Sequence, residues 1–263
     1  MSEGRTLLLI AHGNRHIEPG AEPTYQLARK LAGHLSDWTI DCRYLVRSPH
    51  LSDGPERIFN GEVTVFPNLY ADGIFLRQRL PACLNEWQKS NLVQLLPPVF
   101  KLPGLTALIR RKILQQLEAC QFNSLDTAVI VVGHGALRAR TFSEPADAMA
   151  RQLQCLSPDL HVIPAFIENT PRFTDWAKLT KRKNIIVLPF LAGGGIHTKI
   201  DIPQALYKTT EAEQRSLHLM EAIGDMPELT TLIAGLLTEN SLHKMVRNHF
   251  SQAQERSALP LQI

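Results

Sequence analysis

The stretch Leu-Leu-Leu-Ile-Ala-His-Gly at residues 7–13 recurs as Val-Ile-Val-Val-Gly-His-Gly at residues 129–135. Both are uninterrupted aliphatic runs that end in a His-Gly pair. Such runs are typical of strands that are buried on both faces, as in a parallel sheet covered by helices. The chain therefore contains the first strand of an α/β fold twice, with a spacing of 122 residues.

The repeat extends far beyond this strand. A shift of 122 residues keeps the two halves in register for about eighty positions, and a shift of 124 aligns residues 103–109 with 227–233. Further matching pairs are Glu22 with Glu144, Pro49 with Pro171, Val65 with Val187, Gly73 with Gly195, and Pro81 with Pro203. We predict two tandem copies of one domain, a first copy at residues 1–124 and a second copy at residues 125–263.

Short aliphatic runs alternate with segments of helical spacing in both copies. The predicted strands are 6–11, 40–46, 63–66 and 92–96 in the first copy, and 128–132, 161–167, 184–189 and 218–223 in the second. Helices are predicted over 25–35, 146–156 and 241–253, with two more that begin at 201–203 and at 227. Several of them start with proline, which is well placed in a first helical turn. The alternation predicts a mainly parallel open sheet flanked by helices in each copy.

The composition excludes several classes of protein. Of the 263 residues, 44% are apolar and 20% are charged, as in ordinary globular proteins. The net charge of +3 does not indicate nucleic acid but suits a small anionic ligand. Neither a membrane span nor a signal-like segment is predicted, so we expect a cytoplasmic protein. The four cysteines form no CxxC pair, which argues against a zinc ribbon or an iron–sulfur cluster.

Three potential metal ligands follow three different predicted strands of the second copy. His134, Glu168 and His197 each come at or after the carboxyl end of a strand. Because ligands of open parallel sheets bind at that edge, we expect the three side chains to lie together. Two imidazoles and a carboxylate suit Fe(II), Co(II), Ni(II) or Zn(II), and the same groups can act as general bases near neutral pH.

Each of these residues alone could be an ordinary solvated loop residue, and only their common location argues for a site. The first copy provides an internal comparison, because it has His12, Val46 and Phe75 at the matching positions. Two of its three polar side chains are thus replaced by apolar ones. We predict a degenerate site in the first copy and a working site in the second, and whether His12 contributes is left open.

The glycine run at residues 193–195 allows two interpretations. It could cradle a phosphate. It lacks the GxxxxGK[ST] and GxGxxG patterns, however, and we expect no helix directly after it. We therefore interpret the run as a flexible lip where a flat ligand can approach the backbone. The Gly-His-Gly turn is not a nucleophile elbow, because no serine occupies its centre.

These motifs resemble the sirohydrochlorin chelatase family of class II, ATP-independent chelatases. The resemblance rests on Gly-His-Gly at 133–135, Phe-x-Glu at 166–168, and Gly-Gly-x-His-x-x-x-Asp-Ile-Pro at 194–203, and it covers nearly the whole chain. It implies a lyase that inserts Co2+ or Fe2+, with Ni2+ as a further option, into sirohydrochlorin or a related early tetrapyrrole of sirohaem- or cobalamin-type biosynthesis. It implies that His134, Glu168 and His197 bind the metal and assist proton removal, and that the divalent metal is a substrate while no cofactor is needed.

The same resemblance implies cationic walls, because sirohydrochlorin is a polycarboxylate and arginine pairs well with carboxylates. The predicted substrate-binding residues are Arg138, Arg140, Arg172 and Lys199, and Arg15, Arg47 and Arg77 lie on rim segments of the first copy. Any one of them could instead be a surface charge. We expect the first copy to face the second as a lid and an anion-binding wall.

Two other functions stay open at this point. The same pocket could belong to a tetrapyrrole or metal carrier without turnover, or to a hydrolase that activates water with a firmly held metal. We expect a tetrapyrrole as the partner and neither nucleic acid nor membrane. We also expect a monomer with an internal pseudo-dimer, because a tandem duplication removes the need for a second chain. The sequence does not fix the physiological metal.

Overall fold

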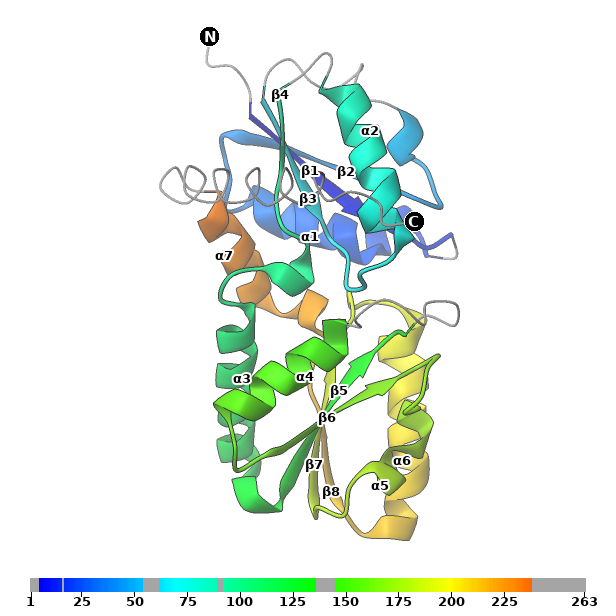
Figure 1. Ribbon diagram of the computed structural model, residues 1–263, viewed down its shortest axis with the longest axis vertical. Helices are drawn as coiled ribbons and strands as arrows, with labels where there is room; N and C mark the ends of the chain where they lie inside the picture. Colours follow the sequence, from blue (N-terminus) through cyan, green and yellow to red (C-terminus); the bar gives the residue numbers. More distant parts are fainter. Residues whose placement is uncertain (1–4, 16, 54–61, 89–91, 136–144, 238–263) are drawn as a thin grey trace, which may run out of the picture.

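The computed structural model describes residues 5–15, 17–53, 62–88, 92–135 and 145–237, drawn in colour in Figure 1. The predicted substrate-binding residues Arg138 and Arg140 and the predicted helix at 241–253 lie outside these ranges. Within them, no helix is long and apolar enough to cross a membrane.

Two four-stranded parallel sheets form the framework, with the strand orders β2-β1-β3-β4 and β6-β5-β7-β8. The strands are β1 (Arg5–Ala11), β2 (Trp38–Tyr44), β3 (Glu62–Pro67), β4 (Leu92–Leu95), β5 (Thr127–Gly133), β6 (His161–Phe166), β7 (Asn184–Pro189) and β8 (Ser216–Leu219). The helices are α1 (Pro23–Ala32), α2 (Leu80–Trp87), α3 (Leu105–Cys120), α4 (Pro145–Leu156), α5 (Trp176–Leu179), α6 (Ile202–Glu213) and α7 (Pro227–Leu236). The predicted fold class, two parallel α/β units in tandem, is confirmed.

Short helical segments connect these elements. The 3-10 segments are η1 (Pro19–Ala21), η2 (Leu51–Asp53), η4 (Val99–Lys101), η5 (Ser124–Asp126), η6 (Phe173–Asp175) and η8 (Ile223–Asp225). Two π-helical turns, η3 (Phe75–Arg79) and η7 (His197–Asp201), occupy matching positions in the two copies. Each leads directly into the helix that follows, α2 or α6.

Most predicted boundaries lie within two or three residues of the structure, and β7 matches fully. The last strand is an error: it ends at Leu219, whereas the prediction ran to Ile223. Ile223 is buried in the turn η8, so its apolar character reflects packing of the turn and not a strand. Helix α1 also starts earlier than predicted, because the buried Glu22 carboxylate accepts hydrogen bonds from the backbone N–H groups of Thr24 and Tyr25.

Both faces of each sheet are buried, as the aliphatic runs predicted. In β1, Leu7 and Leu9 belong to a core that extends over both sheets, while Leu8 and Ile10 pack with α2 on the other face. In β5, Val129 and Val131 join the same extended core. The opposite face of the second sheet packs against Trp176 and the start of α6.

The two copies exchange the helices α3 and α7. Helix α3 belongs to the first copy in sequence but lies beside α4 and the second sheet (Figure 1). Its Arg110 Nε donates to the carbonyl oxygen of Leu156 at 3.0 Å, and its Thr106 hydroxyl donates to the Gln152 side chain at 2.6 Å. In return, α7 of the second copy packs against α1. We call β1–β4 with α1, α2 and α7 the first lobe, and β5–β8 with α3–α6 the second lobe.

One ion pair joins the exchanged helices, because Lys112 Nζ of α3 lies 3.0 Å from Glu228 Oε1 of α7. The hydrogen bond from Lys112 holds the pKa of the Glu228 carboxyl below its ordinary value. A depressed carboxyl pKa stabilises the fold above its unfolded pKa of about 4.3 and loses that effect as the pH falls through the folded value.

Glu228→Gln is therefore expected to lower the free energy of unfolding at pH 7 and to lower it less at pH 3, measured by urea titration at both values. Glu221→Gln serves as the control, because Glu221 Oε1 lies 3.7 Å from the same ammonium group. The Glu221 effect should be smaller. An equal deficit of Glu228→Gln at both pH values would contradict the role given to this pair.

Candidate active site

The three predicted site residues of the second copy lie together at the carboxyl edge of its sheet. His134 Nδ1 lies 3.8 Å from Glu168 Oε2, and the His134 and His197 rings meet edge to face with their centroids 5.1 Å apart. All three side chains are between one third and one half exposed, so a ligand can reach them. The expectation that three strands bring these residues to one edge is confirmed. Their chemical roles stay a prediction.

Backbone hydrogen bonds explain why Glu168 stands beside His134. The pairing of β5 with β6 continues past the strand ends, because Ile167 N–H donates to the Gly133 carbonyl at 3.1 Å and Glu168 N–H donates to the His134 carbonyl at 3.0 Å. The register of the parallel pair thus carries over to the two side chains. In the first copy Val46 N–H donates to the His12 carbonyl at 3.2 Å in the same way, but valine supplies no ligand atom.

Asp201 orients His197, and the sequence analysis did not assign it a role. His197 Nδ1 lies 2.7 Å from Asp201 Oδ2, four residues along the π-helical turn. A carboxylate on one ring nitrogen fixes the tautomer and leaves Nε2 for a ligand, as is common around metal-binding histidines. The spacing His-x-x-x-Asp was the available signal. The first copy has Phe75 and Arg79 at these positions.

The histidine Nε2 atoms are the open ligand positions. The Nδ1 atom of His134 lies 3.1 Å from the Gly135 carbonyl, and that of His197 is taken by Asp201. As the side chains stand, no three His, Cys, Asp or Glu residues in the described part of the chain are close enough to hold one ion together. Metal binding by His134, Glu168 and His197 therefore requires a small closure around the ion.

The glycine run before His197 is fixed by a carboxylate of its own lobe. Gly194 N–H donates to Asp225 Oδ2 at 3.2 Å. Contrary to expectation, a helical turn follows the run directly, because η7 starts at His197. This arrangement still argues against a phosphate cradle, since the backbone donor of Gly194 already has an anionic partner. The run also adjoins the first lobe, where the ring of Pro23 lies against Gly194.

Gly193 is the glycine of the run at which any side chain would displace Asp225. Its φ is +82°, and a Cβ atom there would lie 2.2 Å from Asp225 Oδ1. Gly193→Ala is expected to lower the free energy of unfolding by about 2 kcal/mol or more, because it adds a backbone strain to a steric clash.

Gly195→Ala is the matched control for this substitution, because a Cβ atom there would meet only the Gly193 carbonyl oxygen at 3.8 Å. Urea unfolding of both variants measures the difference. Equal stability of the two variants would show that Asp225 does not constrain the run.

The first copy keeps the backbone of the site but only one of its three potential ligands. His12 is exposed, and its Nδ1 lies 3.1 Å from the Gly13 carbonyl, as His134 does in the second copy. Phe75 packs partly buried against the core of the first lobe. Of the three positions, only His12 offers a ligand atom, and the degenerate site of the first copy stays a prediction.

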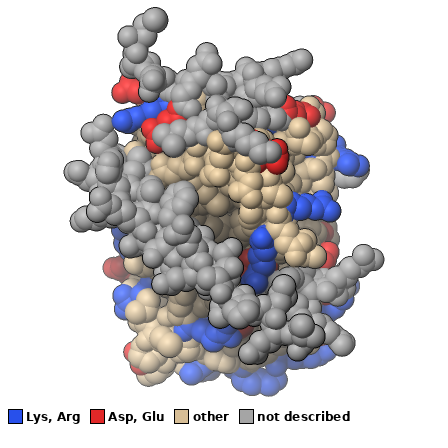
Figure 2. Space-filling view, turned by 45° about the horizontal axis from the view of Figure 1, so that its top comes forward, with Lys and Arg blue, Asp and Glu red and all other residues tan. Residues whose placement is uncertain are grey.

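The predicted cations fall into two groups. Arg172 and Lys199 are exposed, and within the described residues neither forms an ion pair. Arg15 and Arg47 of the first copy instead donate to backbone carbonyls, Arg15 to that of Val46 and Arg47 to those of Asn14 and Ile17. Those two arginines hold the loop after β1. The face in Figure 2 is hollowed near its middle, with Lys and Arg side chains near its border.

Comparisons with known proteins agree with this fold. A family model described as CbiX matches residues 128–240, which contain all three predicted site residues. A search of curated protein sequences found no match. The structure of CbiX described as the terminal enzyme for biosynthesis of siroheme in denitrifying bacteria is 27% identical, with a TM-score of 0.67, over 88% of this chain and 97% of that one.

Two structures of SirB share the fold at lower identity. SirB from Bacillus subtilis with Fe3+ has a TM-score of 0.70 at 16% identity and covers 94% of this chain and 98% of that one. The sirohydrochlorin chelatase SirB from Bacillus subtilis subspecies spizizenii, in complex with cobalt, has a TM-score of 0.66 at 14% identity, over 94% and 97% of the two chains. The family model identifies residues 128–240 as a CbiX domain, and the chain as a whole shares the fold of these chelatase structures.

Proposed function

We propose that this protein inserts a divalent metal ion into sirohydrochlorin or a closely related early tetrapyrrole, without ATP. The observation that carries the proposal is the meeting of His134, Glu168 and His197 at one exposed sheet edge. The CbiX match over this region supports it, as does the 27% identical CbiX, which is described as an enzyme of siroheme biosynthesis.

The three side chains suit the two tasks of metal insertion. The ion must exchange water for other ligands, and imidazole and carboxylate groups can take part of its first shell while leaving exchange possible. Two pyrrole N–H protons must also leave the macrocycle, and a neutral imidazole accepts a proton near neutral pH. Both tasks fall to the same residues, so the ion and the proton acceptors are brought to the macrocycle together.

Each side chain of the site has its own proposed role. We assign to His134 the position nearest the macrocycle, as ligand and proton acceptor. His197, oriented by Asp201, and Glu168 hold the incoming ion and take part in further proton transfer. Arg172 and Lys199 supply exposed positive charge for carboxylates of the substrate. Co2+, Fe2+ and Ni2+ have similar preferences for this ligand set, so metal availability would select among them.

The test is anaerobic absorbance spectroscopy of sirohydrochlorin in excess over the protein, with Co(II) added last. We expect several equivalents of metallated product per protein, formed faster than in the protein-free control. A spectral shift that stops at one equivalent without product would indicate a tetrapyrrole carrier. No shift, together with a metal that survives gel filtration, would favour a metal-dependent hydrolase.

A further inference from the structure

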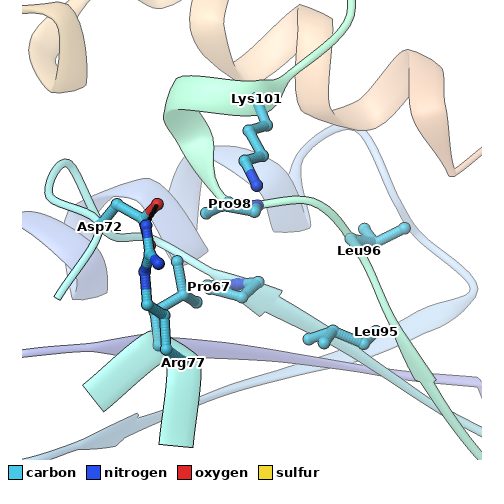
Figure 3. A pocket seen from close by; sticks show the side chains of 8 residues that line it. Pro67, Asp72, Arg77, Leu95, Leu96, Pro98 and Lys101 are labelled. Carbon is cyan, nitrogen blue, oxygen red and sulfur yellow. Dashed lines mark hydrogen bonds and ion pairs between the residues drawn. The ribbon is translucent and has the colours of Figure 1, made fainter. Parts of the chain in front are cut away.

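A second pocket lies in the first lobe, outside the three-residue site. It opens where β3 and β4 end, has a volume of about 200 Å³, and is lined by apolar residues and by Asp72, Arg77 and Lys101. Figure 3 shows Lys101 reaching into it from η4, while Arg77 stands beside Asp72 on the other wall. Pro67, Leu96 and Pro98 form apolar walls, and all three are buried.

The charges of this pocket do not cancel. Arg77 is held by Asp72 in a two-pronged pair, with Nε 3.0 Å from Oδ1 and Nη2 2.8 Å from Oδ2. Lys101 is exposed and lies over the Phe100 ring at 5.7 Å, and among the described residues it has no carboxylate partner. Among the described residues that line the pocket, two cations and one anion leave one positive charge, on an ammonium group that reaches into an apolar-walled pocket.

The second copy shows that this arrangement is particular to the first. The repeat places Gly194 opposite Asp72, Lys199 opposite Arg77, and Asp225 opposite Lys101. In the second copy the Asp225 carboxylate lies on the glycine run and accepts the Gly194 N–H. The same place in the first copy has a lysine and an open pocket instead. The first copy has therefore lost two metal ligands and acquired a cationic pocket.

We propose that this pocket binds a carboxylate on a short aliphatic arm. The carboxylate would accept hydrogen bonds from Lys101 Nζ and from an N–H of Arg77, while the methylene groups lie against Pro67, Leu96 and Pro98. Asp72 fixes the plane of the Arg77 guanidinium and also competes with the bound carboxylate for the positive charge of Arg77. Since a water molecule occupies about 30 Å³, the pocket has room for about seven heavy atoms and not for a macrocycle.

One aromatic contact joins the surroundings of the pocket to the second lobe. Asp72 follows Tyr70, whose ring packs edge to face on Phe190 of the second lobe at 5.9 Å. Arg77 belongs to η3, the counterpart of the η7 turn that begins with His197. Resting on the proposed function, the arm is a carboxylate side chain of the tetrapyrrole. A free small carboxylate has the same chemistry and is the other source.

The experiment measures binding without metal, so it is independent of turnover. Sirohydrochlorin is titrated by absorbance and succinate by NMR, into the full chain and three variants. Lys101→Gln should raise the Kd about tenfold, as expected when a hydrogen bond to a charged group is lost. Asp72→Asn should lower the Kd about threefold, because it removes the competing charge while retaining an oxygen for Arg77. Lys30→Gln, on the exposed side of α1, should change nothing.

The two probes distinguish the two sources. Opposite shifts of the sirohydrochlorin Kd in Lys101→Gln and Asp72→Asn support the tetrapyrrole arm. The same opposite shifts for succinate alone support a site for a free carboxylate. Unchanged Kd values for both probes in both variants, with unaltered thermal unfolding, overturn the proposal. If the proposed function fails instead, the assay with Co(II) gives no metallated product, while binding in the metal-free titration still depends on Lys101.

Discussion

Alanine at position 197 is expected to lower the rate of metal insertion by at least about 100-fold, the usual effect of losing a positioned proton acceptor. The loss should exceed that of a general base alone, because the imidazole is also a proposed metal ligand. Asp201 loses its 2.7 Å contact with the imidazole in this variant. It cannot replace His197, because its carboxylate lies at a different position on the turn. Anaerobic initial rates of metallated product measure the effect.

The internal duplication supplies the control for this experiment. His134→Ala should show a similarly large loss, whereas His12→Ala should change the rate less than about threefold. His12 has the same backbone setting as His134 but lacks a carboxylate and a second histidine beside it. Equal losses in all three variants would show that the working half has been assigned wrongly.

The isolated second copy, residues 125–263, is expected not to fold as a monomer. It lacks α3, which belongs to the second lobe in space. Leu105, Ile109, Ile113 and Leu117 of α3 are buried in the core that they share with β5 and β7. Their burial corresponds to about 6–12 kcal/mol at 1.5–3 kcal/mol for each side chain. A domain has roughly 5–15 kcal/mol of stability in total, so the loss is of the same size as the whole.

Circular dichroism melting and gel filtration of this fragment test the expectation. A second fragment, residues 104–263, keeps α3 and should recover a cooperative transition at a lower temperature than the full chain. Monomeric 125–263 that melts cooperatively near the temperature of the full chain would show that α3 is dispensable for the second lobe.

The repeat and the strands could be predicted because their signal is local. The aliphatic runs at 7–11 and 129–132 must be strands buried on both faces whatever surrounds them. The meeting of His134, Glu168 and His197 followed from one rule about the edges of parallel sheets. The register of the adjacent strands β5 and β6 then places Glu168 beside His134, because their backbone hydrogen bonds continue past the strand ends.

The exchange of α3 and α7 could not be predicted. Helical spacing shows which side of a helix is apolar, but Leu105, Ile109 and Ile113 would look the same whichever sheet they cover. The sequence boundary near residue 124 is thus not the boundary between the lobes. The chain passes from β4 through η4 into α3, and only the folded structure shows that α3 then packs beside α4.

The residues that support the site were also hard to predict from the sequence, some more than others. Asp201 had a signal, because four residues separate it from His197 on a helical turn. Asp225 had none, since only the folded turn η8 brings its carboxylate against Gly193 and Gly194. Likewise, the pairing of Arg77 with Asp72 and the pocket beside Lys101 depend on how β3 and β4 end together.

The central claim is that the second copy holds the metal and the first does not. Anomalous diffraction at the cobalt edge, from crystals grown with Co(II), tests it most directly. We expect one strong peak within about 2.0–2.2 Å of ligand atoms of His134, Glu168 and His197. A peak at His12 with none at this cluster would contradict it.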